Sequence, residues 1–138
     1  MMINDKMPEY CVDRAAKILN KVKKAMNGSK VLVLGVAYKQ DIDDYRESPA
    51  LKVIDVLERE GAEVTFFDPW VKEYKHNGQT RQSIPALTED VLKAADLVMI
   101  TTAHTNIDYD MVQKNAALIF DTKNAMKNIA NRENIEVL

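Results

Sequence analysis

The chain has 138 residues with 19 basic and 21 acidic side chains, a formal net charge of −2 and a hydrophobic fraction of 46%. This length and apolar content predict one packed core. The near balance of charge argues against a protein that coats nucleic acid or binds membranes through a polybasic surface. A single cysteine excludes an internal disulfide, and no apolar run approaches the roughly 20 residues of a membrane span.

The four glycines exclude the common phosphate-binding loops. They stand at positions 28, 35, 61 and 78, so neither G-x-G-x-x-G nor G-x-x-x-x-G-K-[ST] can be written on this chain. One cysteine and two histidines leave few soft metal ligands, and we expect no metal site. No signal peptide opens the sequence, and we therefore expect a cytoplasmic protein.

Helices and strands are predicted to alternate in the first half of the chain. Pro8 suits a first helical position, because its missing N–H would be unsatisfied there, and apolar residues then recur at helical spacing until Asn27-Gly28 supplies a stop. Ser48 caps a second helix that Pro49 opens. The first strand of this half, 31–34, is a short, continuous apolar run, which is typical of a strand buried on both faces. These elements are helices over 8–26 and 49–60 and strands over 31–34 and 64–67.

The second half continues the alternation after a stretch with little pattern. Residues 70–86 are predicted to be loop, with a short extended piece near 82–84. Thr88 caps the next helix. The chain end is either an edge strand or loose. The remaining elements are helices over 89–95 and 109–114, strands over 97–100 and 118–120, and the uncertain end at 135–138.

This alternation indicates an α/β fold. Strands that look buried on both faces and alternate with helices predict a three-layer, Rossmann-like domain with an open, mostly parallel sheet. The first helix has no strand before it, and we therefore interpret it as a linker. The predicted division is a linker helix over residues 1–28 and a domain over residues 29–138.

Ligands of open α/β sheets bind outside the carboxyl ends of the strands, and the residues that follow each strand are the candidates. Tyr38 and Lys39 follow the first strand and Lys123 follows the fourth, so a phosphate-bearing ligand could use the lysines as charge partners and the ring as a stacking surface. Asp68 and Asp121 also end strands, and we expect them to cap turns, which is the commonest use of such aspartates.

Further candidate residues lie outside the strand ends or have no clear partner, and Arg46 and Trp70 each allow two interpretations. Arg46 is expected to be either salt-bridged or directed at a phosphate or carboxylate. The acidic stretch around it lacks the glycine and final glutamate of a calcium loop. His104 has no recognisable nucleophile beside it, which favours a turn-stabilising role. Cys11 lies on an apolar helix stripe and is expected to be inert packing, whereas Trp70 fits either a surface anchor or a core lid.

A long string of residues resembles one family. Gly35-Val36-Ala37-Tyr38-Lys39, followed by the segment from Asp41 to Ala50 and by Gly61-Ala62 and Asp68-Pro69, is similar to the C-terminal domain of the UDP-glucose/GDP-mannose dehydrogenase family. Met7 to Tyr10 resembles the end of the family's central linker helix, and Asp121 to Asn124 resembles its "DTRN" segment. The resemblance covers residues 7–126 and is strongest to the UDP-N-acetylglucosamine and UDP-N-acetylmannosamine 6-dehydrogenases.

The resemblance implies a substrate-binding part of an NAD-dependent enzyme that oxidises the C6 alcohol of a UDP-sugar to a carboxylate with two NAD. It implies that Tyr38 packs near the uracil, that Lys39 and Lys123 reach the phosphates or sugar, and that Arg46 reaches toward NAD. Lys123 stands where the family often has arginine, and a lysine cannot make the same bidentate contact. The resemblance places no catalytic residue in this chain, since the catalytic cysteine and the NAD glycines belong to other segments of the family.

The implied partners are the UDP-sugar, the N-terminal and central domains of the same enzyme and, at full length, further copies of it; nucleic acid and membrane are not expected partners. NAD would be bound mainly by the N-terminal domain, and the isolated chain is expected to be inactive. The alternative is a free-standing, non-catalytic nucleotide-binding or interaction module that uses the same fold. We also weighed a phospho-receiver domain, but no acidic pair follows the first strand and Asp-Thr-Lys follows the fourth.

Overall fold

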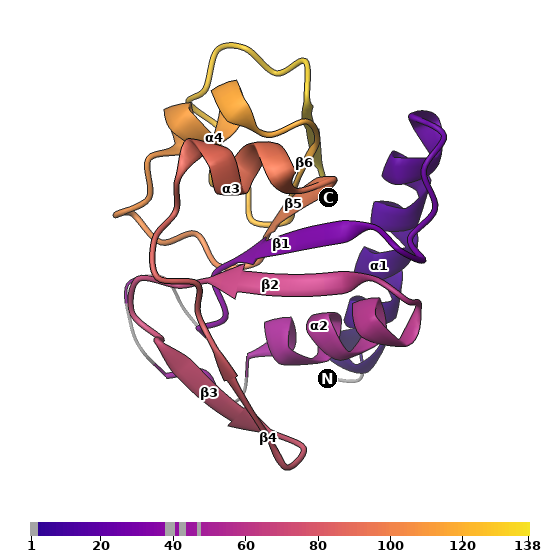
Figure 1. Cartoon of the computed structure of the whole chain (residues 1–138), viewed down its shortest axis with the longest axis vertical. Helices are drawn as coiled ribbons and strands as arrows, with labels where there is room; N and C mark the ends of the chain where they lie inside the picture. The colour runs from indigo at the N-terminus through magenta and orange to yellow at the C-terminus, as the bar shows by residue number, and fades with distance from the viewer. Residues whose placement is uncertain (1–2, 38–40, 42–43, 47) are drawn as a thin grey trace.

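The structure, a computed structural model, describes residues 3–37, 41, 44–46 and 48–138. Helices and strands alternate through most of the chain, as the sequence predicts (Figure 1). The elements are α1 (Ile3–Lys21), β1 (Lys30–Leu34), α2 (Pro49–Arg59), β2 (Glu63–Phe67), β3 (Glu73–His76), β4 (Gln79–Gln82), α3 (Glu89–Ala94), β5 (Leu97–Ile100), α4 (Tyr109–Asn115), β6 (Ile119–Asp121) and β7 (Ile135–Val137).

The main sheet has five strands in the order β2-β1-β5-β6-β7. Every neighbouring pair is parallel, with Val31 opposite Val64 and Leu97, and Ile119 opposite Val98 and Ile135. The chain end that could have been strand or loose is the edge strand β7. The predicted α/β class with an open parallel sheet is confirmed.

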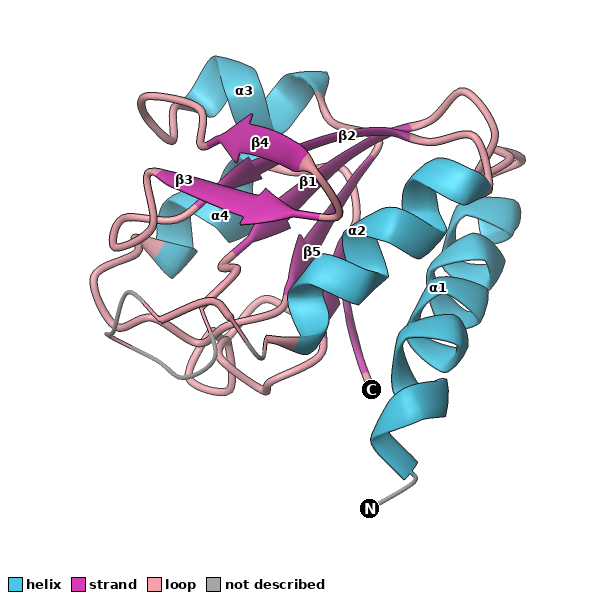
Figure 2. Ribbon diagram, turned by 90° about the horizontal axis from the view of Figure 1, so that it is seen from below, coloured by secondary structure: helices cyan, strands magenta, loops and turns pink. Residues whose placement is uncertain are grey.

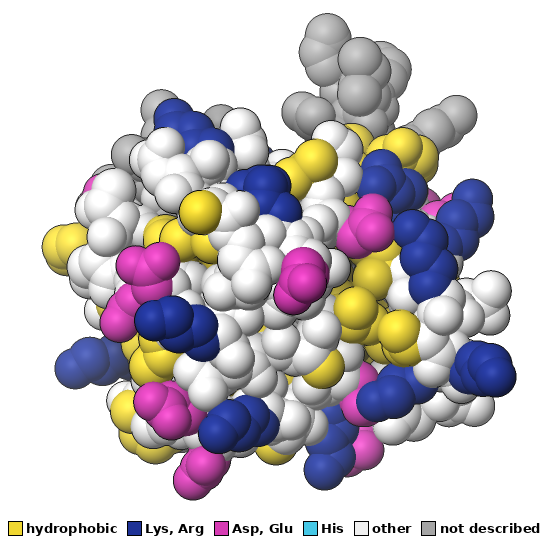
Figure 3. Space-filling view, turned by 90° about the horizontal axis from the view of Figure 1, so that it is seen from above, with side chains coloured by type: hydrophobic (Ala, Val, Ile, Leu, Met, Phe, Trp, Pro, Cys, Tyr) yellow, Lys and Arg dark blue, Asp and Glu magenta, His cyan; other side chains and the backbone are white. Residues whose placement is uncertain are grey.

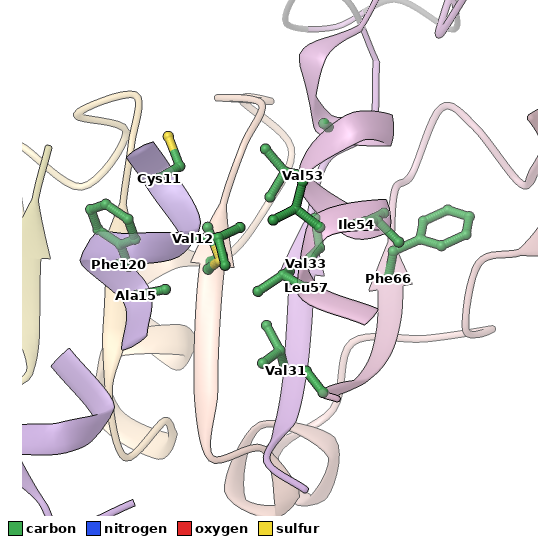
Figure 4. Close-up of a cluster of buried hydrophobic side chains, with 14 of the residues drawn as sticks. Cys11, Val12, Ala15, Val31, Val33, Val53, Ile54, Leu57, Phe66 and Phe120 are labelled. Carbon is green, nitrogen blue, oxygen red and sulfur yellow. The ribbon is translucent and has the colours of Figure 1, made fainter. Parts of the chain in front are cut away.

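Helices cover both faces of this sheet, α1 and α2 on one side and α3 and α4 on the other (Figure 2). Alternate residues of β1 serve the two layers: Val31 and Val33 face α1 and α2, whereas Leu32 and Leu34 belong to the second cluster. In the first layer Val53 and Leu57 of α2 lie against β1 (Figure 4). The two-sided burial explains why β1 and β5 have unbroken apolar runs, whereas the edge strands β2 and β7 are only partly buried.

The first helix differs from its prediction at both ends. It begins at Ile3, which places Pro8 inside the helix rather than at its first position, and it ends at Lys21 rather than near Gly28. Lys23 takes a left-handed conformation (φ 65°), and the Lys24 N–H donates to the Leu19 carbonyl at 3.0 Å. This turn closes the helix without a glycine. Met26 returns to the core from the following loop, so the apolar spacing continued past the true end.

The prediction of loop over residues 70–86 is wrong, because this stretch contains the antiparallel hairpin β3–β4. Asn77 and Gly78 both have positive φ, 51° and 78°, as a two-residue hairpin turn of the primed type requires. Asn-Gly is the strongest short sequence signal for such a turn. Tyr74 anchors the hairpin, since its buried ring packs at 5.2 Å from that of Phe66.

The face of the molecule shown in Figure 3 carries charged side chains of both signs. Lys and Arg side chains are interspersed there with Asp and Glu rather than gathered into a field of one sign (Figure 3). Within the described residues, no helix is both long enough and apolar enough to cross a membrane.

Candidate functional site

The candidate site lies at the carboxyl ends of β1 and β5. From β1 the chain proceeds to β2 on one side, and it later returns to place β5 on the other side. This reversal is the topological switch point at which open α/β sheets form their ligand crevice. The segment that leaves β1 at Gly35 therefore enters the position where a ligand is expected.

Gly35 lets the two strand ends approach each other closely. Its φ is +92°, and a Cβ atom on it would lie 2.4 Å from Cβ of Thr102. The Thr101 hydroxyl donates to the Gly35 carbonyl, and the Gly35 N–H donates to the Phe67 carbonyl at 2.9 Å. Only glycine fits this position without displacing the end of β5.

Asp68, directly after β2, is a buried acceptor for five donors. Its Oδ2 accepts the N–H groups of Val36 at 2.8 Å and Ala37 at 3.2 Å. Its Oδ1 accepts the N–H groups of Trp70 at 2.8 Å and Val71 at 3.0 Å. The fifth donor is His104, whose Nε2 lies 2.9 Å from Oδ2. The expectation that Asp68 caps a turn is confirmed, and the same carboxylate also ties β2 to the segment after β1.

His104 follows β5 and is fully buried. Its Nδ1 accepts the N–H of Asp41 at 2.7 Å, so the proton of a neutral ring lies on Nε2, which donates to Asp68. The histidine's own carbonyl accepts the Tyr109 hydroxyl at 2.7 Å. His104 therefore joins three segments, and its expected turn-stabilising role extends to a link between β2 and the residues after β1.

Asp41 is hydrogen-bonded through its backbone N–H and through its carboxylate. It takes a left-handed conformation with φ 60°, and its carboxylate accepts the Thr105 N–H at 2.9 Å and the Thr105 hydroxyl at 2.8 Å. These hydrogen bonds from Thr105 lower the pKa of the Asp41 carboxyl. The residue is thus fixed against the turn after β5.

The pKa of Asp68 is set by two opposing effects. Burial raises it, because the charged form loses water, but the hydrogen bonds from His104, Val36 and Trp70 outweigh burial and leave the pKa below its ordinary value. Asp68 is therefore an ionised, fully hydrogen-bonded carboxylate inside the protein, which fits a structural anchor better than a proton donor.

Hydroxyl groups complete the anchoring of this segment. The Ala37 carbonyl accepts the Thr102 hydroxyl at 2.9 Å and the Ser48 hydroxyl at 3.2 Å. Ser48 also accepts the Ala50 N–H at 3.2 Å, which is the predicted cap of α2. The backbone of Ala37 is thereby fixed at its N–H by Asp68 and at its carbonyl by two hydroxyls.

Two of the four predicted ligand residues, Tyr38 and Lys39, lie outside the described residues. Arg46 is largely exposed (81%), and its Nε and Nη2 lie 3.1 and 3.3 Å from the Asp44 carboxylate. The pKa of Asp44 is lowered by these hydrogen bonds. The salt bridge expected for Arg46 is present, and its direction toward a ligand stays a prediction.

Lys123 lines a pocket of about 100 Å³ together with Cys11, Pro49 and Thr101. This pocket joins the ends of β5 and β6 to the first turn of α2, so Lys123 lies at the predicted edge. Asp121 accepts the N–H groups of Lys123, Ala125 and Met126 and so caps the turn that carries the lysine.

Cys11 is buried, whereas Trp70 lies at the surface. Cys11 is buried in the same core cluster as Val12, Ala15 and Phe120 (Figure 4). Burial raises the pKa of its thiol in spite of Lys123 and Arg14, which confirms that it is packing. Trp70 is 46% exposed, so the surface reading holds. The described residues contain no cluster of three or more side chains fit to hold a metal ion.

Sequence reasoning considered Asp68 and His104 separately and missed that they form a pair. Both follow strands that end at the same edge, which was the available signal. The roles of Thr101 and Thr102 were also missed, since hydroxyls that bond to backbone carbonyls leave no distinctive spacing in a sequence.

Residues 32–128 match the UDP-binding domain of the UDP-glucose/GDP-mannose dehydrogenase family. A UDP-N-acetyl-D-mannosamine dehydrogenase of Methanocaldococcus jannaschii is 34% identical over 139 aligned residues, which span 95% of this chain and 29% of the relative. A similar enzyme of Pyrococcus horikoshii is 30% identical over 91% of the chain and 29% of its own length. The chain thus spans less than a third of the length of these relatives.

Solved structures agree with the sequence matches. The fold resembles the UDP-D-ManNAc dehydrogenase of Pyrococcus horikoshii with a TM-score of 0.80 and 28% identity, over 99% of this chain and 31% of that one. It resembles the UDP-N-acetyl-mannosamine dehydrogenase Cap5O of Staphylococcus aureus with a TM-score of 0.74 and 32% identity, over 99% of this chain and 32% of that one.

Proposed function

The chain belongs to the UDP-glucose/GDP-mannose dehydrogenase family as its UDP-binding domain, and from this premise we propose that it binds the UDP-sugar substrate of an NAD-dependent 6-dehydrogenase. The observation that carries the proposal is the match over nearly the whole chain to dehydrogenases named for UDP-N-acetyl-D-mannosamine. The proposed substrate class is a UDP-N-acetylhexosamine, whose C6 alcohol becomes a carboxylate as two NAD are reduced. The proposed cellular setting is cytoplasmic synthesis of a sugar precursor for polysaccharide.

The proposed roles of individual residues are those that the resemblance to the family implies. Tyr38 packs beside the uracil, and Lys39 and Lys123 bind the phosphates or the sugar, since ammonium groups are effective partners for phosphate oxygens. Arg46, which precedes α2, reaches toward NAD in the assembled enzyme. The support for Lys123 is its place in the pocket at the ends of β5 and β6.

The catalytic cysteine and most of the NAD site belong to other parts of the enzyme in this proposal. The chain covers 29% of relatives that carry the whole activity, and its own cysteine is buried with a raised pKa. In this proposal residues 1–28, which include α1 (Ile3–Lys21), are the end of the central linker, and residues 29–138 form the binding domain, whose partners are the N-terminal and central domains. A homo-oligomer is the proposed state of the full-length enzyme.

A titration with UDP tests the proposal. We expect weak, saturable binding followed by NMR chemical shifts, because other domains supply further walls of the site, and we expect Lys39→Ala to weaken it about tenfold. Lys17→Ala is the matched control, since Lys17 is an exposed lysine of α1, and its affinity should equal that of the wild type.

Equal UDP affinity of the wild type and Lys39→Ala would remove Lys39 from the site, and absence of UDP binding to the wild type would reject the proposed function. The same preparation should reduce no NAD with UDP-N-acetylhexosamines. Turnover would contradict the assignment of catalysis to other domains. UDP binding by a protein whose gene encodes no NAD-binding half upstream would favour the free-standing module instead.

A further inference from the structure

We propose that His104 and Asp68 are positioning residues for nucleotide binding, acting through the backbone N–H groups of Ala37 and Asp41. The inference rests on the proposed function, because its ligand is UDP. Neither side chain is exposed, so neither can touch a ligand directly. Their effect must pass through residues to which they are hydrogen-bonded, and two of these, Ala37 and Asp41, lie next to the proposed ligand residues.

Ala37 and Asp41 flank residues 38–40, which include the proposed ligand residues Tyr38 and Lys39. Asp68 Oδ2 accepts the Ala37 N–H at 3.2 Å on one side. His104 Nδ1 accepts the Asp41 N–H at 2.7 Å on the other. Because His104 Nε2 and Asp68 Oδ2 are 2.9 Å apart, one buried pair sets the distance between the two flanking residues.

The pair is stiff for a physical reason. A buried N–H that loses its acceptor costs far more than an exposed one, because water cannot replace the partner. The His104 ring has one proton and two partners, and both are satisfied only when Asp41 and Asp68 occupy their present positions. The left-handed conformation of Asp41 (φ 60°) is maintained by this ring and by Thr105.

The second histidine of the chain provides a control. His76 Nε2 lies 2.8 Å from Asp55 Oδ2, where the hairpin β3–β4 meets α2. The His76 and Asp55 side chains are 25% and 40% exposed. Both histidines thus face an aspartate at nearly the same distance, but among the described residues only His104 is hydrogen-bonded to the segment after β1.

Two substitutions of His104 separate its two hydrogen bonds. In His104→Gln the amide nitrogen can replace Nε2 and keep the bond to Asp68, but the acceptor for the Asp41 N–H is lost. In His104→Asn the amide oxygen can replace Nδ1 and keep that acceptor. The experiment measures amide hydrogen exchange at Asp41, UDP affinity by NMR titration and the urea midpoint for both variants, with His76→Gln as the control.

We expect His104→Gln to speed exchange at Asp41 at least tenfold and to weaken UDP about tenfold. His104→Asn loses the bond to Asp68, but that carboxylate is still held by four backbone N–H groups, so the variant should keep Asp41 protected and bind UDP within about threefold of the wild type. His76→Gln should match the wild type in both measurements. This order would distinguish positioning from a merely structural role, in which UDP affinity would follow the urea midpoint regardless of Asp41.

Three results would overturn the inference. Unchanged exchange at Asp41 in His104→Gln would show that the ring does not hold the backbone there. Unchanged UDP affinity in His104→Gln, with a wild type that binds UDP, would reject positioning while leaving the proposed function intact. A wild type that binds no UDP would reject the proposed function itself, and the ligand role of the pair with it, whatever exchange at Asp41 shows.

Discussion

Two histidine–aspartate pairs of this chain have nearly the same geometry and very different surroundings. His104 and Asp68 lie 2.9 Å apart with both side chains fully buried at the carboxyl edge of the sheet. His76 and Asp55 lie 2.8 Å apart on the surface, between the hairpin and α2. The distance between partners therefore says little about what a pair contributes.

The two pairs differ in whether water could replace the aspartate as a hydrogen-bond acceptor. Asp68 accepts five hydrogen bonds, four of them from backbone N–H groups, and these donors would face a dry interior without it. Asp55 accepts from two side chains, His76 and Asn77, that water can also reach. A buried polar group that organises backbone should matter several times more than an exposed pair of similar length.

Removal of the buried carboxylate should have the largest effect. Asp68→Ala leaves four backbone donors and His104 without their acceptor, and we expect it to lower the free energy of unfolding by about 3–5 kcal/mol. Urea denaturation followed by circular dichroism measures this. Asp55→Ala is the matched control and should cost less than about 1 kcal/mol. Similar losses in the two variants would contradict the contrast drawn between the pairs.

Two glycines extend the comparison to the backbone, Gly35 at the carboxyl edge of the sheet and Gly78 in the turn of the hairpin. Gly35→Ala should cost about 3 kcal/mol, because a left-handed φ of +92° is combined with a Cβ position 2.4 Å from Cβ of Thr102. Gly78→Ala, in the hairpin turn with φ +78° and open space around it, should cost about 1 kcal/mol. Thermal or urea unfolding checks both. Equal costs would mean that the end of β5 yields easily to a methyl group.

Acid should weaken the buried anchor in a defined pH range. The pKa of Asp68 in the folded protein lies below its ordinary value of 3.8, so the unfolded chain takes up the proton first. The stabilisation is complete well above pH 4 and is lost as the pH falls through the folded value. The free energy of unfolding between pH 6 and pH 3 should therefore fall less steeply in Asp68→Asn than in the wild type.

Asp44→Asn provides the exposed counterpart for the pH measurement. The pKa of Asp44 is also lowered, by hydrogen bonds from Arg46, but solvent screens this pair. Its substitution should change the pH dependence less than Asp68→Asn does. A larger change in Asp44→Asn would show that the exposed pair dominates acid sensitivity.

The sheet was predictable because its signals are local. The runs at 31–34 and 97–100 are apolar at every position, because these strands are buried on both faces and need no alternation. The run at 64–67 is interrupted by the exposed Thr65, in keeping with the edge position of β2. Ser48 and Thr88 were correctly predicted as helix caps, since a side-chain oxygen can satisfy a helix N–H within a few residues. The hairpin was missed although Asn77-Gly78 is a typical hairpin-turn sequence. The reason is that β4 consists of four polar residues and has no apolar pattern.

The sequence by itself determined the α/β alternation, the edge at which polar residues collect and, through the string from Gly35 to Ala50, the family. Only the tertiary structure decided that Asp68 and His104 form one pair, because their 36 residues of separation in sequence are closed by β5 lying beside β1 rather than by any local spacing. The left-handed turn at Lys23 was likewise fixed by packing, which returns Met26 to the core. Short-range sequence patterns specify individual helices and strands, whereas contacts across a sheet depend on the spatial order of its strands.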